Sequence, residues 1–330
     1  MAEGRKLTMA EAVREAMSME MRNDPKVFLA GEDIGIIGGA FGVTGKMIEE
    51  FGPERMLNTP ISETAIAGIG VGAAAAGYRP IVEIMFVDFI GIAMDEISNQ
   101  AAKMRYMFGG KAKVPMVVRT ACGAGVRGAG QHSQSLEAWV AHIPGLKVVM
   151  PSNSYDAKGL LLTSIRDDNP VIFLEHKVIY GMSSYCPEGE YTVPLGEAKL
   201  VHEGSDATIV AWGLMVHKAD QAAKELEKDG ITVDLVDIRS LVPLDTKTII
   251  DSVKKTGRLV IVQEACRTGG FAGEISAIVA EEAFPYLKGP IIRVTAPNTT
   301  IPLSPILEDE FIPSPEKIKD AVNKLVKGQK

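Results

Sequence analysis

The sequence predicts an α/β protein with two domains, each built on a mainly parallel sheet wrapped by helices. Short apolar runs alternate with amphipathic stretches of helical period along most of the chain. Residues 175–205, rich in Gly and Pro, interrupt that alternation. The length of 330 residues also exceeds one ordinary core and suits two α/β domains. We therefore predict a first domain at 1–185, a linker at 186–205 and a second domain at 206–330.

The composition indicates a soluble globular protein. The apolar share of 46% and the charged share of 23% are typical of that class. A net charge of −7 argues against a basic surface for nucleic-acid phosphates. No apolar run reaches the length of a membrane-spanning helix, and the first residues lack the hydrophobic core of a signal peptide. The isolated cysteines Cys122, Cys186 and Cys266 fit a reducing cytoplasm and indicate no zinc or disulfide site.

The first domain opens with a clear local signal. Thr8 and Glu11 form a capping box, which predicts a helix over 8–21. Glu32 and Asp33 follow the next strand, where α/β proteins place their sites, although two solvated loop acids would give the same pattern. The other elements predicted here are strands at 27–30, 81–86, 114–119, 146–149 and 171–174, and helices starting at Thr44, at 63–77, at 88–107, around Trp139 and at 154–167.

The second domain repeats the alternation of strands and helices. Its predicted strands lie at 207–212, 232–237, 258–263 and 291–294, and its predicted helices at 215–229, 245–255, 271–284 and 316–326. Prolines from Pro297 to Pro315 predict a mostly irregular segment before the last helix, because proline interrupts regular hydrogen bonding.

One carboxylate stands in a stretch of small and apolar residues, 57–89. Glu63 follows Ser62, a good N-cap, and an acid there suits the positive end of a helix dipole. That accounts for the acid but not for the glycines that follow, since each costs a helix roughly 1 kcal/mol relative to alanine. A helix keeps such residues where something lies against its backbone. We therefore expect a cofactor or a second subunit on this helix.

A glycine-rich loop after a predicted strand ends at His132. The spacing Gly123-x-Gly125-x-x-Gly128 is that of a dinucleotide fingerprint, but the acid expected about 20 residues later is missing. An NAD-binding oxidoreductase using the loop at 123–128 is therefore an alternative of a different class, and a flexible surface turn is the simplest alternative. His132 differs from an ordinary solvated histidine because it ends this loop at the C-terminal side of a strand.

Ordered motifs give the chain a family resemblance. They are NTPISE at 58–63, FVDF at 86–89, GAGQHSQSLEAW at 128–139, PGLKVVMPS at 144–152, DAKGLL at 156–161, VDIRSLVPLD at 236–245 and PLSPILED at 302–309. With them the whole chain resembles the beta subunit of the thiamine-diphosphate-dependent component of 2-oxoacid dehydrogenase complexes (pyruvate, branched-chain) and of acetoin dehydrogenase. The resemblance implies a transketolase-like pyrimidine-binding domain followed by a transketolase C-terminal-like domain.

The resemblance implies roles for four side chains. Glu63 matches the glutamate that hydrogen-bonds the aminopyrimidine ring and promotes deprotonation of the thiazolium carbon; burial favours the protonated carboxyl that this role uses. Phe89 matches the aromatic residue that packs on the pyrimidine ring. His132 matches the active-site histidine for proton transfer and for transfer of the acyl unit to the lipoyl group. The resemblance also assigns Glu32 to an acidic network between two active sites.

A monovalent-cation site, for K⁺, is a further implication of the resemblance. Its matching residues are Met116, Ser164, Ile165, Asp167 and Asn169. Most ligands would be backbone carbonyls, and the oxygens of Asp167 and Asn169 suit a hard cation. An ordinary helix C-terminus would keep the same residues, so both interpretations stay open.

The resemblance also implies an assembly. Two beta chains pair with two alpha chains in a heterotetramer, and the family's alpha chain supplies a Gly-Asp-Gly motif for the diphosphate and Mg²⁺. This sequence has no Gly-Asp-Gly. We therefore predict a cytoplasmic oxidoreductase subunit, active only with an alpha subunit, that acts on pyruvate or acetoin. It would transfer the acetyl unit to lipoamide of a dihydrolipoyl acyltransferase core.

Other functions remain alternatives. A branched-chain 2-oxoacid dehydrogenase beta subunit shares most of these motifs, although the segments at 86–91, 105–112 and 131–136 resemble acetoin dehydrogenase beta chains closely. Transketolase and deoxyxylulose-phosphate synthase share the domain pair, but they carry both halves of the site on one longer chain. A non-catalytic scaffold for the acyltransferase is the third alternative.

Overall fold

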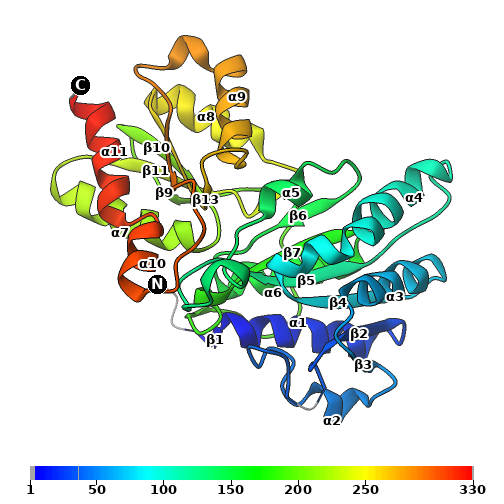
Figure 1. The fold of residues 1–330 in the computed structure, drawn as a ribbon. Coiled ribbons are helices and arrows are strands. Elements are labelled where there is room, and N and C mark those ends of the chain that lie inside the picture. The colour runs from blue at the N-terminus through cyan, green and yellow to red at the C-terminus, as the bar shows by residue number, and fades with distance from the viewer. Residues whose placement is uncertain (1–3, 36, 329–330) are drawn as a thin grey trace. The chain divides into compact units, whose positions relative to one another are not determined.

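The computed structural model describes residues 4–35 and 37–328 (Figure 1). The chain divides into two units. The first consists of Met1–Cys122 with Trp139–Leu195, and the second of Gly123–Ala138 with Gly196–Lys330. The glycine-rich loop after Cys122 therefore belongs to the second unit, although it interrupts the sequence of the first.

A parallel sheet forms the core of the first unit. Within this unit its strands run in the order β6-β7-β5-β4-β2-β3, and each neighbouring pair is parallel. The bounds of these strands are β2 Val27–Glu32, β3 Met56–Thr59, β4 Arg79–Phe86, β5 Val117–Cys122, β6 Lys147–Val149 and β7 Val171–His176. The strands β1 (Lys6–Thr8) and β8 (Ser183–Tyr185) form a small antiparallel pair. The parallel arrangement confirms the predicted fold class for this half.

Helices flank this sheet. They are α1 Met9–Asn23, α2 Met47–Phe51, α3 Glu63–Ala75, α4 Ala102–Met107 and α6 Ser154–Arg166, with short turns at η1 Val87–Ala93, η2 Asp95–Ala101 and η4 Lys177–Ile179. The predicted capping box is confirmed: the Thr8 side chain accepts from the Glu11 backbone N–H, and the Glu11 carboxylate accepts from Thr8 N. The helix α1 packs against α6, and α3 packs against β4.

The stretch predicted as one helix over 88–107 changes its hydrogen-bond spacing twice. It begins as a 3-10 helix, η1, continues as a π-helix, η2, and ends as α4. Both η1 and η2 pack against α3. The prediction of one regular helix was therefore wrong, because an apolar period reports which face is buried and not the hydrogen-bond spacing that packing selects.

The second unit has its own sheet, in the order β14-β13-β10-β11-β9. Its first three neighbouring pairs are parallel, whereas β9 runs antiparallel to β11. The strands are β9 Lys199–His202, β10 Ala207–Ala211, β11 Val233–Asp237, β12 Ser240–Val242, β13 Leu259–Cys266 and β14 Ile292–Ala296. The helices are α7 Leu214–Lys228, α8 Thr246–Thr256, α9 Ala272–Glu282, α10 Pro305–Phe311 and α11 Pro315–Lys327, with short turns at η3 Ala129–Gln131 and η5 Phe284–Tyr286.

Two short helices need separate mention. The helix α5 (Glu137–Ala141) lies where the chain passes from the second unit back to the first. The helix α10 occupies the tail that the prolines predicted as mostly irregular. Pro305 stands in its first turn, where a proline costs no hydrogen bond. That prediction was wrong over these residues.

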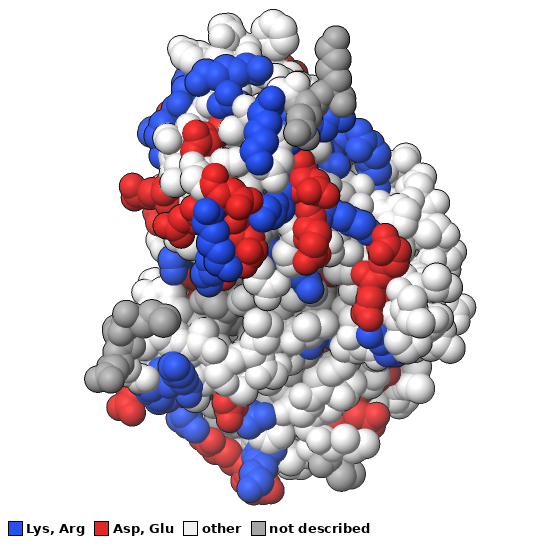
Figure 2. Space-filling model, turned by 90° about the vertical axis from the view of Figure 1, so that its left-hand side faces the viewer, with Lys and Arg blue, Asp and Glu red and all other residues white. Residues whose placement is uncertain are grey.

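Within the described part of the chain, no helix is long and apolar enough to cross a membrane. On the face drawn in Figure 2, basic and acidic side chains are intermixed. The described residues on this face therefore show no patch of a single charge sign.

Candidate functional site

Glu63 is the first residue of α3 and is buried, with 6% of its surface exposed. The positive end of the helix dipole stabilises an acid at this position. The expected cap is absent: the Ser62 side chain makes no cap hydrogen bond, although its carbonyl accepts from Ile66 N. Glu63 therefore gains nothing from a local capping motif and lies at the helix start as a buried acid.

Glu32 lies beside this acid, at the C-terminal end of β2. It is buried, and its Oε1 has no hydrogen-bond partner among the described residues. Burial, followed by the negative charges of Glu63 and Asp33, raises the pKa of Glu32, against a hydrogen bond from the Ser62 backbone N–H. The two carboxyls therefore form a like-charge pair in which protonation of Glu32 is favoured.

The glycines of the helix α3 have two different explanations. At Gly70 a Cβ would lie 2.8 Å from the Met116 side chain and 2.9 Å from that of Val82, so close packing against the sheet requires glycine. At Gly72 a Cβ would meet nothing within 4 Å. The sheet thus accounts for the inner glycine, while the outer one belongs to an exposed face of the helix.

Phe89 is half-buried in η1 and belongs to a series of aromatic contacts. Its ring packs edge-to-face on Phe86 at 6.0 Å, and Phe86 packs in the same way on Phe41 at 5.7 Å. Phe41 in turn stacks on Tyr180 at 5.2 Å. These contacts hold the Phe89 ring, and with it η1, against the end of β4.

A buried ion network underlies these aromatic rings, and our sequence reasoning missed it. Arg119 on β5 is 1% exposed; it donates two hydrogen bonds of 2.7 Å to Glu175 and one of 2.7 Å to Glu83. Burial raises the pKa of Glu83, and it likewise raises that of Tyr180, next to the Glu175 carboxylate. The signal in the sequence was a charged residue inside each of three apolar strands, β4, β5 and β7.

In the second unit, His132 follows η3 and is half-buried. Tight backbone packing precedes it. A Cβ on Gly128 would lie 2.8 Å from the His132 carbonyl oxygen and 2.9 Å from Ser133 Oγ. Gly123 N donates to the Gln134 carbonyl at 2.9 Å, so the segment between them closes on itself. The loop is therefore a folded element and not a flexible surface turn.

Two buried carboxylates occupy the amides of this glycine loop. Glu264 on β13 accepts from Ala124 N at 2.6 Å, and Glu308 on α10 accepts from Gly125 N at 2.8 Å and from Arg127 N at 3.2 Å. In a dinucleotide site such amides bind the pyrophosphate. Negative side chains already hold these positions, and they would repel a pyrophosphate. The geometry thus opposes the NAD-binding alternative.

The five residues of the predicted cation site lie near one another in the first unit. Val171 N donates to the Met116 carbonyl, which joins the segment before β5 to the segment after α6. Arg79 donates to the carbonyls of Ile165 and Asp167 at 3.0 and 3.1 Å. Although burial opposes ionisation, hydrogen bonds from Lys147 and Asn169 lower the pKa of Asp167. Basic side chains thus already occupy several oxygens of the predicted site, since Arg105 also donates to Asn169 Oδ1 at 2.8 Å.

Over residues 4–35 and 37–328, no three or more His, Cys, Asp or Glu side chains gather as a metal site. The cation site above depends on backbone carbonyls and is of a different kind.

Comparisons with known proteins decide the family. The family model "Transketolase, pyrimidine binding domain" matches residues 5–182, and "Transketolase, C-terminal domain" matches residues 196–318. Over 336 aligned positions the chain is 51% identical to the beta subunit of acetoin:2,6-dichlorophenolindophenol oxidoreductase from Cupriavidus necator, covering 99% of both chains. The chain belongs to the family of acetoin and pyruvate dehydrogenase beta subunits. Enzymes of this family use thiamine diphosphate.

Other relatives of this beta-subunit family match over nearly their whole length. The pyruvate dehydrogenase E1 component subunit beta of Rickettsia felis is 48% identical, and the alignment covers 97% of this chain and 98% of the Rickettsia chain. The 2-oxoisovalerate dehydrogenase subunit beta of Bacillus subtilis is 45% identical, with 96% and 97% covered. Among solved structures, a split-gene transketolase described as an inactive beta4 tetramer superposes with a TM-score of 0.82 at 22% identity, covering 98% of this chain and all of its own. That likeness confirms the predicted two-domain, transketolase-like fold.

Proposed function

We propose that this chain is the beta subunit of a thiamine-diphosphate-dependent dehydrogenase that acts on acetoin or pyruvate and passes the acetyl unit to lipoamide of a dihydrolipoyl acyltransferase core. The observation that carries the proposal is a buried acid, Glu63, at the start of a small-residue helix in a chain 51% identical to an acetoin oxidoreductase beta subunit. We propose that the two domains join within 186–205, which overlaps residues 183–195 between the two matched family models. We propose the cytoplasm as its location.

Glu63 is proposed to hold the pyrimidine ring nitrogen of thiamine diphosphate. The cofactor, when bound, supplies a carbon nucleophile and an electron sink for cleavage next to a carbonyl group. Glu63 would hold a proton at the ring nitrogen, a role that favours a carboxyl shielded from water. Support comes from the burial of Glu63 and from its neighbour Glu32, because the raised pKa of Glu32 favours a second proton close by. We propose the acidic-network role for Glu32 on the same ground.

Phe89 is proposed to pack on the pyrimidine ring. Its edge contact with Phe86 and the further contacts to Phe41 leave it half-buried in a fixed orientation. An aromatic face held in this way can stack on a planar heterocycle without a loss of side-chain freedom on binding.

His132, in the second unit, is proposed to transfer protons and to serve passage of the acyl unit to the lipoyl sulfur. An imidazole can give and take a proton near neutral pH, which the reduction of a disulfide by an acyl carrier requires. Support comes from the closed loop that carries His132, in which Gly128 packs against the His132 carbonyl.

An alpha subunit is proposed to complete the site with the residues for the diphosphate and Mg²⁺, in a heterotetramer of two alpha and two beta chains. The exposed face of α3 suits a close helix contact, because Ala65, Ile69, Gly72 and Ala76 line it at helical spacing. We expect Gly72→Leu to abolish co-purification of the alpha subunit while the free beta chain keeps its far-ultraviolet circular dichroism. Retention of the alpha subunit would exclude this face as the contact.

A K⁺ ion is proposed to bind the carbonyls around the end of α6, with Met116, Ser164, Ile165, Asp167 and Asn169 as ligands. The support is the group of carbonyl and side-chain oxygens there. Arg79, Lys147 and Arg105 already bind several of them, so the ion would have to share or displace these contacts. We expect KCl to raise the melting temperature of the assembly relative to NaCl of equal ionic strength. Equal melting temperatures in the two salts would favour the ordinary helix end instead.

The proposed function is tested on the assembly purified through this chain. Substrate-dependent reduction of 2,6-dichlorophenolindophenol is measured with acetoin, pyruvate and 2-oxoisovalerate, each with and without thiamine diphosphate and Mg²⁺. We expect thiamine-dependent reduction with acetoin or pyruvate. Reduction with 2-oxoisovalerate alone would assign the branched-chain function, which the 45% identical Bacillus relative supports. No reduction with any substrate, despite a co-purified alpha chain, would refute the proposed reaction.

A further inference from the structure

We propose that Glu308 is a positioning residue that fixes the loop carrying His132. It lies on α10 and is fully buried. Its Oε1 accepts from Gly125 N at 2.8 Å, and its Oε2 accepts from Arg127 N at 3.2 Å and from Arg127 Nη1 at 2.6 Å. One carboxylate thus receives two backbone hydrogen bonds and one from a guanidinium. The inference rests on the proposed function, in which His132 takes part in acyl transfer.

The backbone of the loop is shaped to receive a carboxylate. Alternate residues have positive φ angles: +88° at Gly123, +100° at Gly125, +62° at Arg127 and +57° at Ala129. Such alternation turns neighbouring N–H groups toward one side and creates a small concave site for an anion. Two of these four residues are not glycine, and for them this conformation is unfavourable in isolation. The carboxylate of Glu308 compensates for that cost.

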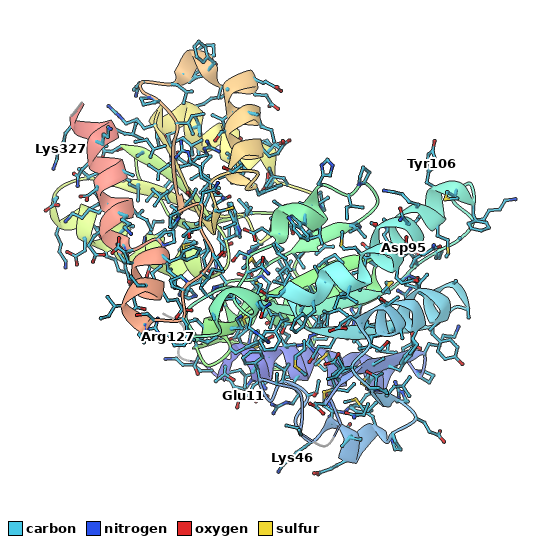
Figure 3. The ribbon with its side chains drawn as sticks, viewed as in Figure 1. Glu11, Lys46, Asp95, Tyr106, Arg127 and Lys327 are labelled. Atoms are coloured by element: carbon cyan, nitrogen blue, oxygen red, sulfur yellow. The ribbon has the colours of Figure 1, made fainter. Side chains whose placement is uncertain are left out.

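The Glu308 carboxylate and the loop amides depend on each other for their hydrogen bonds. A buried carboxylate is stable only when its oxygens are hydrogen-bonded, and the loop amides provide those donors. Conversely, removal of Glu308 would leave the Gly125 and Arg127 amides without their acceptor. The buried side of α10 consists of Glu308 and Phe311, while Ile306 and Leu307 are 80% and 58% exposed. Figure 3 shows Arg127 at the foot of α10.

A second carboxylate closes the loop at its two ends. Glu264 accepts from Ala124 N at 2.6 Å and from Ser135 Oγ at 3.3 Å. Gly123 N also donates to the Gln134 carbonyl. The chain is thus tied just before and just after His132, and Glu308 supplies the additional tie between these ends.

The experiment uses the assembled enzyme with its alpha subunit and the variants Glu308→Ala and Glu308→Gln. The matched control is Glu310→Gln, on the same helix, where the exposed carboxylate pairs with Lys317. Hydrogen–deuterium exchange is followed in peptides covering 121–136. We expect the amides of Gly125 and Arg127 to exchange about tenfold or more faster in Glu308→Ala, because each loses a charge-assisted hydrogen bond. Glu308→Gln is expected to give a smaller increase, and Glu310→Gln none.

Activity separates positioning from general stability. Lipoamide-dependent turnover and dye reduction are compared in each variant, with KM for thiamine diphosphate measured alongside. A positioning role predicts a lower ratio of lipoamide turnover to dye reduction with KM for the cofactor unchanged. A merely structural role predicts that all three quantities deteriorate together. If Glu308→Ala does not assemble, Glu308→Gln gives the same comparison, since it keeps the side-chain volume.

Three distinguishable results would overturn either the proposed role of Glu308 or the proposed role of His132 on which it rests. Unchanged exchange in both Glu308 variants would show that the carboxylate does not hold the loop. Faster exchange with an unchanged activity ratio would show that the loop needs no positioning. Wild-type turnover in His132→Ala would refute the proposed role of the histidine itself, while the exchange result would still decide whether Glu308 holds the loop.

Discussion

Glu63→Gln tests the central acid of the proposed site with the least structural disturbance. The change keeps the volume of a side chain that is only 6% exposed, so no cavity is created. It removes the group that would hold a proton at the pyrimidine nitrogen. General acid–base catalysis contributes typically about 10²- to 10⁴-fold, or about 3 to 5 kcal/mol at 1.36 kcal/mol per tenfold. We expect kcat to fall by that factor.

The same substitution has a separate effect on stability, with a defined sign. The pKa of Glu32 is raised by its burial and then by the charge of Glu63, so the folded state binds this proton more tightly than the unfolded chain does. The resulting stability is complete in acid and is lost as the pH rises through the folded-state pKa. Removing the charge of Glu63 lowers that pKa, and the contribution of Glu32 to stability should then decline less from acid to neutral pH. We expect the variant to be at least as stable as the wild type at neutral pH.

The assay is dye reduction by the assembled enzyme at saturating thiamine diphosphate and Mg²⁺, with chemical unfolding at several pH values. The control is Glu49→Gln, an exposed acid on α2 of the same unit, which should match the wild type in both measurements. A kcat within about threefold of wild type for Glu63→Gln would refute the proton-holding role. It would also favour the scaffold alternative.

Further predictions concern the surroundings of the two proposed sites. Arg119→Met should destabilise the protein by about 3 to 5 kcal/mol in urea unfolding, because it leaves the buried Glu175 and the partly buried Glu83 without their cation; a loss under 1 kcal/mol would contradict this. Glu32→Gln should remove the contribution of Glu32, so the melting-temperature advantage of the wild type over the variant should shrink from acid to neutral pH; a difference that does not change with pH would show that Glu32 does not titrate in this range. Gly128→Ala should lower kcat through the contact of its Cβ with the His132 carbonyl, whereas Gly181→Ala, which meets nothing within 4 Å, should not; equal rates would show that the loop tolerates the side chain.

Local signals in the sequence predicted local structure well. The capping box of Thr8 and Glu11 is formed because both partners lie within one helical turn. The alternation of apolar runs and helical periods predicted both sheets, since each element buries one face whatever its partner is. The family motifs identified Glu63, Phe89 and His132 as candidates, and the roles proposed for them remain predictions.

Features that depend on distant partners were not predictable in this way. Arg119 is 36 residues from Glu83 and 56 from Glu175, and no local pattern connects them. The helix α10 was missed because prolines on both sides of it indicate irregular chain, while its one buried acid, Glu308, looks like any other surface glutamate in sequence. Only the structure shows that Glu308 accepts hydrogen bonds from loop amides 181 and 183 residues away in the sequence.

Buried carboxylates in the two units differ in how completely they are satisfied, and that difference separates reactive from structural acids. Glu308 receives hydrogen bonds from two amides and a guanidinium, so both of its oxygens are occupied and its charge is compensated. Among the described residues, Glu32 Oε1 has no hydrogen-bond partner, and the charge of Glu63 lies nearby, so binding of a proton to Glu32 is favoured. A carboxylate whose oxygens all accept hydrogen bonds has little capacity left for a substrate or cofactor. A carboxyl with an oxygen that lacks a hydrogen bond can offer both an acceptor and a proton. On this criterion we propose acid–base chemistry for Glu32, beside Glu63, and a geometric contribution for Glu308 through the loop that it holds.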